Sequence, residues 1–327
     1  IIPKAIFSVL NGRKIPLHGG GLSIRSFIHC EDIGSAIDLI LEKGKIGETY
    51  HISPRKKISI LDLVKLIASE LKVDFGDATN SCFTSGGCAS RTRGLFHQGE
   101  NIFTELDFVT ISSKGDATDF GDVTSSNGGS MASNSTRAID FISGGVTIES
   151  ITIAQTGNSV DFGDKNYSAT GTASCASPTR AIVAGGYGPS PYPQYNNIEY
   201  VTIPTAGNAV DFGNLTFGHS NIASCSNATR GLIAGGYTFP SPATTYYNTI
   251  EFITLSSSGN ATDFGDLTST GTQPAGVSSP IRAVFAGRSD GGGEEDVIDL
   301  VSIMTTGNAV DFGNLLAGRR NIAPASN

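Results

Sequence analysis

The stretch Asn208-Ala-Val-Asp-Phe-Gly-Asn214 decides the fold, because close variants of it recur along the chain. Aligned on the aspartate of the Asp-Phe-Gly core, the copies lie at Asp119, Asp161, Asp211, Asp263 and Asp311. The steps between copies are 42, 50, 52 and 48 residues, a spacing at which one repeat forms one blade of a β-propeller. Most of the chain is therefore predicted to be a repeat protein.

Each repeat divides into four short segments with the apolar and polar patterns of β-strands. A small-residue segment comes first, an apolar segment opened by an arginine second, an alternating segment with an acid third, and the Asp-Phe-Gly stretch fourth. Four antiparallel strands make one propeller blade, with the phenylalanine packed between neighbouring blades. The predicted fold class is mainly β, a propeller of about five four-stranded blades over residues 73–327 after a small α+β fragment. Residues 73–77 and 321–327 match a fourth and a first strand without their blades, so we expect an incomplete propeller.

Charge divides the chain near the same boundary. Residues 1–72 hold 11 Lys and Arg and 7 Asp and Glu, a net charge of +4, whereas the remainder carries a net charge of −12. The acidic repeat region would repel a phosphate backbone, which argues against nucleic-acid binding. No apolar run is long enough to predict a membrane span.

The first part carries a set of motifs in a distinctive order. They are Gly12-Arg-Lys-Ile-Pro-Leu-His-Gly-Gly-Gly21, Arg25-Ser-Phe-Ile-His-Cys-Glu-Asp32, Gly47-Glu-Thr-Tyr-His-Ile-Ser53 and Ser59-Ile-Leu-Asp-Leu-Val64. Over residues 1–72 this order resembles the C-terminal part of extended short-chain dehydrogenases, in particular NAD-dependent nucleotide-sugar epimerases and 4,6-dehydratases. The resemblance implies a substrate lobe in which Arg25 contacts the diphosphate of the sugar nucleotide, a role that suits the paired donors of a guanidinium.

The same resemblance implies NAD chemistry, but two motifs that the chemistry needs are missing. A Gly-x-x-Gly-x-x-Gly turn and a Tyr-x-x-x-Lys pair occur nowhere in the sequence. We therefore expect no cofactor, with NAD only where a dehydrogenase domain precedes Ile1, and no catalysis by residues 1–72 as they stand. The two patterns meet at Val73-Asp-Phe75, and we expect this join to be a recombination or assembly junction.

The repeats resemble kelch repeats, since Gly-Gly ends the second strand in two copies, at Gly185-Gly186 and Gly235-Gly236. Phenylalanine of Asp-Phe-Gly replaces the kelch tryptophan, because the chain has no Trp. They also look like Asp-Phe-Gly repeats of predicted bacteriophage proteins, and this resemblance implies a virion or extracellular location for the propeller. For the dehydratase-like part we expect a cytoplasmic location.

An arginine that opens the second strand and an acid of the third strand recur in all five repeats. The pairs are Arg93 with Glu105, Arg137 with Glu149, Arg180 with Glu199, Arg230 with Glu251, and Arg282 with Asp299. Because a binding site rarely needs five identical copies, we expect a structural ion pair or hydrogen bond at these positions.

The segments between second and third strands vary most, and those at 185–197, 235–249 and 287–296 are long. Six of the nine tyrosines lie in the first two: Tyr187, Tyr192, Tyr195, Tyr237, Tyr246 and Tyr247. Aromatic loops held on a rigid scaffold favour a recognition surface for a glycan or protein, although packing of the loops on one another is the alternative.

No catalytic or metal-binding pattern is evident. The five cysteines have no metal-ligand spacing, and Cys88, Cys175 and Cys225 recur at one repeat position, which predicts buried thiols. We therefore expect a non-catalytic binding or structural module. The alternative is the C-terminal part of a nucleotide-sugar 4,6-dehydratase or epimerase, which is inactive as given because the NAD site and the Tyr-x-x-x-Lys pair are absent.

Overall fold

A computed structural model describes residues 22–25, 30–45, 48–53, 57–60, 62–63, 78–79, 85–98, 104–113, 115–125, 127–239 and 244–325. Residue contacts divide the chain into two units, Ile1–Phe75 and Gly76–Asn327. The predicted fourth strand at 73–77 and the join within it lie outside the described residues.

The described part of the first unit contains a two-stranded ribbon and a helix. Strand β1 (Ile24–Arg25) pairs antiparallel with β2 (Ile58–Ser59), and helix α2 spans Cys30–Lys43. Leu39 and Leu41 of the helix are 54% and 79% exposed. The helix therefore exposes large apolar side chains.

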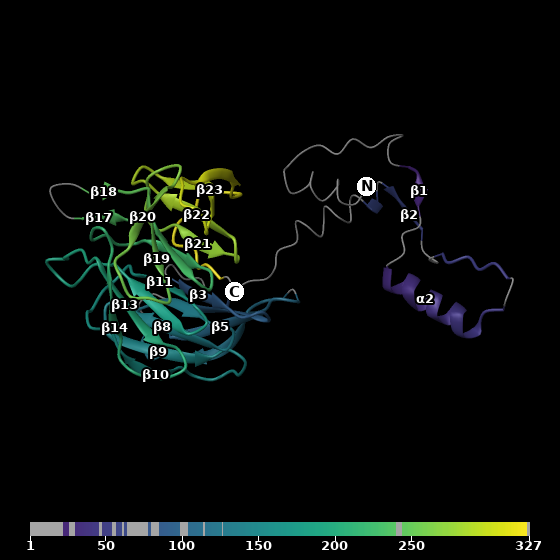
Figure 1. Cartoon of the computed structure of the whole chain (residues 1–327), viewed down its shortest axis with the longest axis horizontal. Coiled ribbons are helices and arrows are strands. Elements are labelled where there is room, and N and C mark those ends of the chain that lie inside the picture. Colours follow the sequence, from purple (N-terminus) through teal and green to yellow (C-terminus); the bar gives the residue numbers. More distant parts are fainter. Residues whose placement is uncertain are drawn as a thin grey trace. The chain divides into compact units, whose positions relative to one another are not determined.

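The second unit contains five four-stranded antiparallel sheets, one for each repeat, arranged as the blades of a propeller (Figure 1). Blade 1 contains β3 (Ser85–Ala89), β4 (Arg93–Gln98), β5 (Glu105–Thr110) and β6 (Thr118–Asp122). Blade 2 contains β7 (Gly129–Ser133), β8 (Arg137–Ile142), β9 (Thr147–Thr152) and β10 (Val160–Asp164). The mainly β, five-bladed prediction is confirmed.

Blades 3 and 4 have longer excursions between their second and third strands than the other blades. Blade 3 contains β11 (Ala173–Ala176), β12 (Arg180–Ala184), β13 (Asn197–Thr202) and β14 (Val210–Asn214). Blade 4 contains β15 (Ala223–Ser226), β16 (Arg230–Ala234), β19 (Thr249–Thr254) and β20 (Thr262–Asp266), with a small extra hairpin of β17 (Tyr237–Thr238) and β18 (Thr245–Tyr246). Blade 5 contains β21 (Ala275–Ser278), β22 (Arg282–Ser289), β23 (Glu294–Ser302) and β24 (Val310–Asn314).

The first strand of each blade lies next to the first strand of the neighbouring blade, so these strands form the inner wall of the propeller. Serine hydroxyl groups join them: Oγ of Ser224 donates to the carbonyl of Ser174, and Oγ of Ser278 to that of Ser226, each at 2.7 Å. Only small side chains fit where the strands converge, which explains the Gly, Ala and Ser content of the first segment.

The Asp-Phe-Gly stretch forms a β-bulge on the fourth strand. In blade 3 Glu199 pairs with Asp211 and Ile198 with Gly213, so Phe212 is the extra residue between them. Its side chain is 2% exposed and packs with Ile233, Ile253 and Leu255 of blade 4. In blades 1 to 4 the bulge thus turns one aromatic ring into the layer between blades, as predicted, whereas the prediction is wrong for Phe312 of blade 5, which is 60% exposed.

Candidate binding surface

The repeated arginines join neighbouring blades. Nη1 of Arg93 donates to the carbonyl of Ile153 in blade 2 at 2.9 Å, and the guanidinium lies 4.7 Å from the ring centre of Phe108. Arg137, Arg180 and Arg230 donate in the same way to Ile203, Leu255 and Ile303 of the next blade. These contacts favour a structural role for the arginines.

The repeated acids join blades at the other end of the strands. Glu251 of blade 4 accepts the backbone N–H of Thr216, which follows the fourth strand of blade 3, at 2.9 Å, and it also accepts that threonine's hydroxyl. Burial raises the pKa of Glu251, although the Thr216 hydrogen bonds oppose the rise. Glu149, Glu199 and Asp299 accept the backbone N–H of Thr124, Asn166 and Thr268 in the same manner.

The strand register corrects the acid assigned to the first repeat. Asp107, and not Glu105, pairs with the aspartate of its Asp-Phe-Gly stretch, as Glu199 pairs with Asp211. Asp107 accepts from the backbone and hydroxyl of Thr79 at 3.0 and 2.6 Å. The sequence Glu105-Leu-Asp107 offers two acids, and the Val-Thr-Ile that follows Phe108 aligns Asp107 with Glu199, in agreement with the register.

A buried ionic cluster between blades 1 and 2 was missed by the sequence analysis. Nδ1 of His97 lies 2.8 Å from Oδ2 of Asp140, and both side chains are fully buried. Nζ of Lys165 donates to the carbonyl of Ile142 at 2.7 Å, and burial lowers its pKa to about 8 although Asp140 and Glu199 oppose the change. The signal in the sequence is weak, because each of these residues occurs in one repeat only.

Blade 5 has its own buried cation, Arg288, which is 1% exposed. Its Nε donates to Glu295 at 3.0 Å and its Nη2 to Asp299 at 2.7 Å. The arginine occupies the place of Gly186 and Gly236 in the earlier repeats, and Gly271 leaves room for its side chain. Each acid is paired with one nitrogen of the guanidinium, which favours a structural role, although Nη1 is buried without a partner among the described residues.

Five aromatic rings from blades 3 and 4 form a continuous cluster, called here the rim cluster. Tyr187 contacts Tyr192 and Phe239, with ring centres 6.2 and 5.3 Å apart. Phe239 stacks on Tyr237 at 5.3 Å, and Tyr237 stacks on Tyr246 at 6.0 Å. Phe239 was not predicted to belong to this surface, because the sequence signal was the concentration of tyrosines in the two loops.

Tyr192 is the most exposed member of the rim cluster, since the other four rings are half-buried. It is 45% exposed and holds a positive φ of 63°, while its N–H donates to the carbonyl of Pro189 at 3.0 Å. A non-glycine residue in this region costs roughly 1 kcal/mol or more, and such residues are common at binding sites. Burial raises the pKa of Tyr237 at the centre of the cluster.

Two of the six predicted tyrosines pack elsewhere. Tyr195 contacts Tyr167, with ring centres 5.0 Å apart, and the Tyr167 hydroxyl donates to the carbonyls of Gly185 and Asn197. Tyr247 packs on Phe217 at 4.6 Å. For these two side chains, packing within the loops describes the structure better than an open recognition surface.

The segment at 287–296 is not a long loop. Strands β22 and β23 extend through it, with Arg288 paired with Glu295 and Ser289 with Glu294. The longer excursions that remain belong to blades 3 and 4, which is where the rim cluster lies.

A cavity of about 290 Å³ lies among the first strands of all five blades. Its walls are the starts of the first strands, with Ser130, Thr172, Asn221 and Gln273 among the polar residues, and none of the described residues that line it carries a charge. The cavity therefore offers neutral hydrogen-bonding groups.

The remaining predicted site residue, Arg25, is exposed on β1, where its Nη1 donates to the carbonyl of Ile24 at 3.3 Å. Cys88, Cys175 and Cys225 are buried free thiols, as predicted. In the described part of the chain no group of three or more His, Cys, Asp or Glu could hold a metal ion. No described helix is long and apolar enough to cross a membrane.

Comparison with known proteins identifies relatives of the N-terminal part. Residues 1–53 match the NAD dependent epimerase/dehydratase family. The dTDP-D-glucose 4,6-dehydratase of Dictyostelium discoideum is 46% identical over 67 residues, 20% of this chain and 15% of that protein. The dTDP-glucose 4,6-dehydratase of Mycobacterium tuberculosis is 37% identical over 82 residues, 24% of this chain and 25% of that protein.

A third relative is the trifunctional UDP-glucose 4,6-dehydratase/UDP-4-keto-6-deoxy-D-glucose 3,5-epimerase/UDP-4-keto-L-rhamnose-reductase of Arabidopsis thaliana. It is 35% identical over 74 residues, 23% of this chain and 11% of that protein. The chain thus spans a quarter or less of the length of these three relatives. Over a small N-terminal part the chain is similar to NAD-dependent nucleotide-sugar dehydratases.

Proposed function

We propose that the propeller is a non-catalytic binding module and that its ligand contacts the rim cluster. The observation that carries the proposal is the run of five touching rings, Tyr192, Tyr187, Phe239, Tyr237 and Tyr246, from two neighbouring blades. Rigid aromatic side chains add contact area at little cost in conformational entropy. The blades below them hold the loops in fixed positions, as a recognition surface requires.

The ligand class that suits this surface is a glycan, or a protein of a cell surface. Aromatic faces pack against the apolar faces of sugar rings, and tyrosine hydroxyl groups provide hydrogen bonds at the edge. We also propose that the repeats are kelch-like and that the propeller belongs to a phage particle outside the cell. The repeat pattern in the sequence supports both points.

The direct test is a glycan array followed by titration calorimetry with the strongest hit. Tyr192→Ala and Phe239→Ala should each weaken binding by about tenfold or more, since each removes a ring of the cluster. Tyr50→Ala is the matched control, because Tyr50 is also 45% exposed but belongs to the other unit. Equal binding by all three variants would exclude the rim cluster.

A second function is favoured by the family match of residues 1–53. The chain would then be the tail of a nucleotide-sugar epimerase or dehydratase, with Arg25 as a diphosphate contact. The two NAD-related motifs are missing from the sequence, so the residues present do not fit the cofactor. Titration with dTDP-glucose tests this proposal: Arg25→Ala should abolish any binding, and absence of binding by the parent chain argues against it.

A further inference from the structure

Four junctions between neighbouring blades are built in the same way. The bulge phenylalanines Phe120, Phe162, Phe212 and Phe264 are 2–3% exposed, because the next blade covers each of them. The third strand of that blade provides the cover: Val301 and Ile303 pack on Phe264. Every junction also has the arginine that donates to the next blade.

A glycine and a side-chain amide complete each junction. At Gly213, which has φ of 148°, an added Cβ would lie 2.4 Å from the carbonyl oxygen of Gly259 in the next blade. One residue later, the N–H of Asn214 donates to the side chain of Asn260 at 3.0 Å. Glycine is thus required here by both the backbone angle and the close approach of the next blade.

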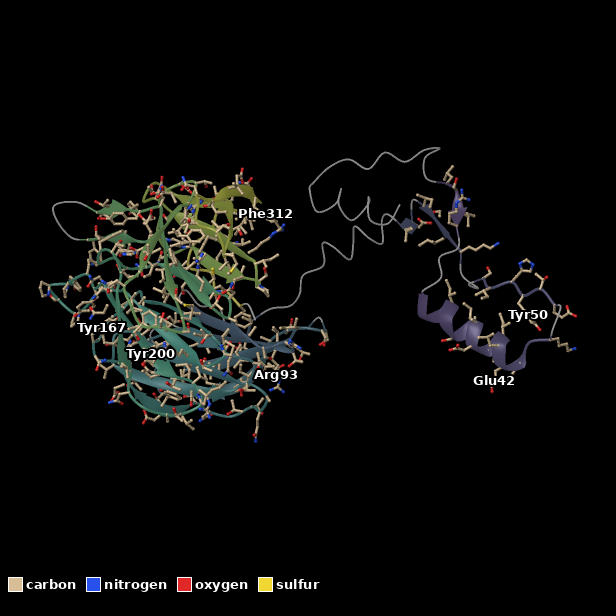
Figure 2. All side chains as sticks on the ribbon, viewed as in Figure 1. Glu42, Tyr50, Arg93, Tyr167, Tyr200 and Phe312 are labelled. Carbon is tan, nitrogen blue, oxygen red and sulfur yellow. The ribbon has the colours of Figure 1, made fainter. Side chains whose placement is uncertain are left out.

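Blade 5 has the same phenylalanine, arginine and glycine as the other blades, but they lie on a face that no described residue covers. Phe312 is 60% exposed at the edge of the blade (Figure 2). Arg282 is exposed, and no carbonyl in the described part of the chain accepts from its guanidinium. Gly313 keeps a φ of 147°, yet an added Cβ would meet nothing within 4 Å. Leu316, at the place of Thr216, adds a fully exposed apolar side chain.

The inner wall of the propeller has one more strand position than there are blades. The N–H of Asn221 donates to Gly171, that of Gln273 to Asn221, and that of Asn321 to Gln273, at 2.8, 2.8 and 3.1 Å. The three donors share a positive φ of 53–59°. Residues 321–325 therefore continue the ring of first strands after blade 5.

The same segment reaches the first blade. A Cβ added to Gly87 of β3 would lie 2.6 Å from the carbonyl oxygen of Pro324. The C-terminal segment begins with Asn321-Ile-Ala323, which is identical to Asn221-Ile-Ala223 at the start of the first strand of blade 4. The segment thus lies between β21 and β3 at the place of a sixth first strand.

From these observations we infer that the open face of blade 5 is the docking face for a sixth four-stranded unit of the same repeat, continuous in one polypeptide with residues 321–325. The occupant has a third strand with branched apolar residues that cover Phe312, a carbonyl that accepts from Arg282, and a Gly-Asn hairpin beside Gly313. This inference does not depend on the ligand of the rim cluster.

The test extends the full chain by its own repeat. Since Asn327 corresponds to Asn227, residues 228–268 are added directly after Asn327 and supply strands two to four. The melting temperature should rise by about 5 °C or more, and amide exchange in β24 should slow about tenfold. The matched control carries Ile253→Asp and Leu255→Asp in the added copy, which removes the residues that would cover Phe312, and it should show neither change. If the two extended chains behave alike, the inference is wrong.

Light scattering on the chain without the extension tests the source of the occupant. A monomer, unchanged by Phe312→Asp, supports a unit in the same polypeptide. A dimer that Phe312→Asp converts to a monomer would overturn the inference, because a second copy would then cover the face.

Discussion

Nδ1 of His97 lies 2.8 Å from Oδ2 of Asp140, and this fully buried contact joins blade 1 to blade 2. Burial opposes a positive charge on the ring, but the charge and hydrogen bond of Asp140, with the charge of Glu149, outweigh it and raise the pKa of His97 above 6.5. The imidazolium is therefore more stable in the folded protein than in the unfolded chain.

This shift predicts a pH dependence of stability. The contribution of His97 is fully present below pH 6.5 and is lost as the pH rises through the higher pKa of the folded state. His97→Gln should therefore cost about 3 kcal/mol of unfolding free energy near pH 6 and less above pH 8. Urea denaturation at both pH values measures the difference, and an equal cost at both would show that the histidine is neutral when folded.

The three buried thiols should resist alkylation. Burial raises the pKa of Cys88 and Cys175 to about 12, and it also raises the pKa of Cys225. Since the thiolate is the reactive form, iodoacetamide at pH 8 should modify these residues at least about a hundredfold more slowly in the folded protein than in guanidinium. Peptide mass spectrometry gives the rate at each site, and rapid labelling of the folded protein would contradict their burial.

The repeat pattern was sufficient to predict the blades, the buried thiols and four of the five phenylalanines between blades, the exception being the exposed Phe312. A period of about fifty residues with four alternating segments leaves few alternatives to a propeller. The pattern also predicted that Tyr187, Tyr192, Tyr237 and Tyr246 lie on loops of neighbouring blades, where the structure brings their rings into contact.

What the sequence could not predict depends mainly on contacts between repeats. The acid of blade 1 was wrongly assigned to Glu105, although the order Asp107-Phe-Val-Thr-Ile111 matches Glu199-Tyr-Val-Thr-Ile203 and already indicates Asp107. The His97 and Asp140 pair breaks the repeat, so periodicity gives no signal for it. Tyr195 and Tyr247 resemble the other loop tyrosines in sequence, and only their partners Tyr167 and Phe217 distinguish them.

Phe264 and Phe312 provide a matched pair, since they occupy the same repeat position and are 2% and 60% exposed. Phe264→Ala should cost about 3–5 kcal/mol, because it leaves a cavity between blades 4 and 5. Phe312→Ala should cost less than about 0.5 kcal/mol, the usual range for a surface change. Urea denaturation of both variants makes the comparison, and a large loss for Phe312→Ala would mean that its ring is covered in solution.

Arg230 and Arg282 provide a second matched pair, since they also occupy the same repeat position in blades 4 and 5. Nη1 of Arg230 donates to the carbonyl of Ile303 at 2.9 Å, and the guanidinium lies 4.4 Å from the ring centre of Phe252. Arg230→Ala should destabilise the fold by about 2 kcal/mol, because it leaves a carbonyl between blades without its donor and removes the packing on the ring. Arg230→Lys should recover only part of this loss, since an ammonium lacks the planar face that stacks on Phe252. Arg282→Ala should change stability little, and thermal unfolding of the three variants in one buffer tests the order. If Arg282→Ala were as costly as Arg230→Ala, the arginine of blade 5 would have a partner in solution that the structure does not show.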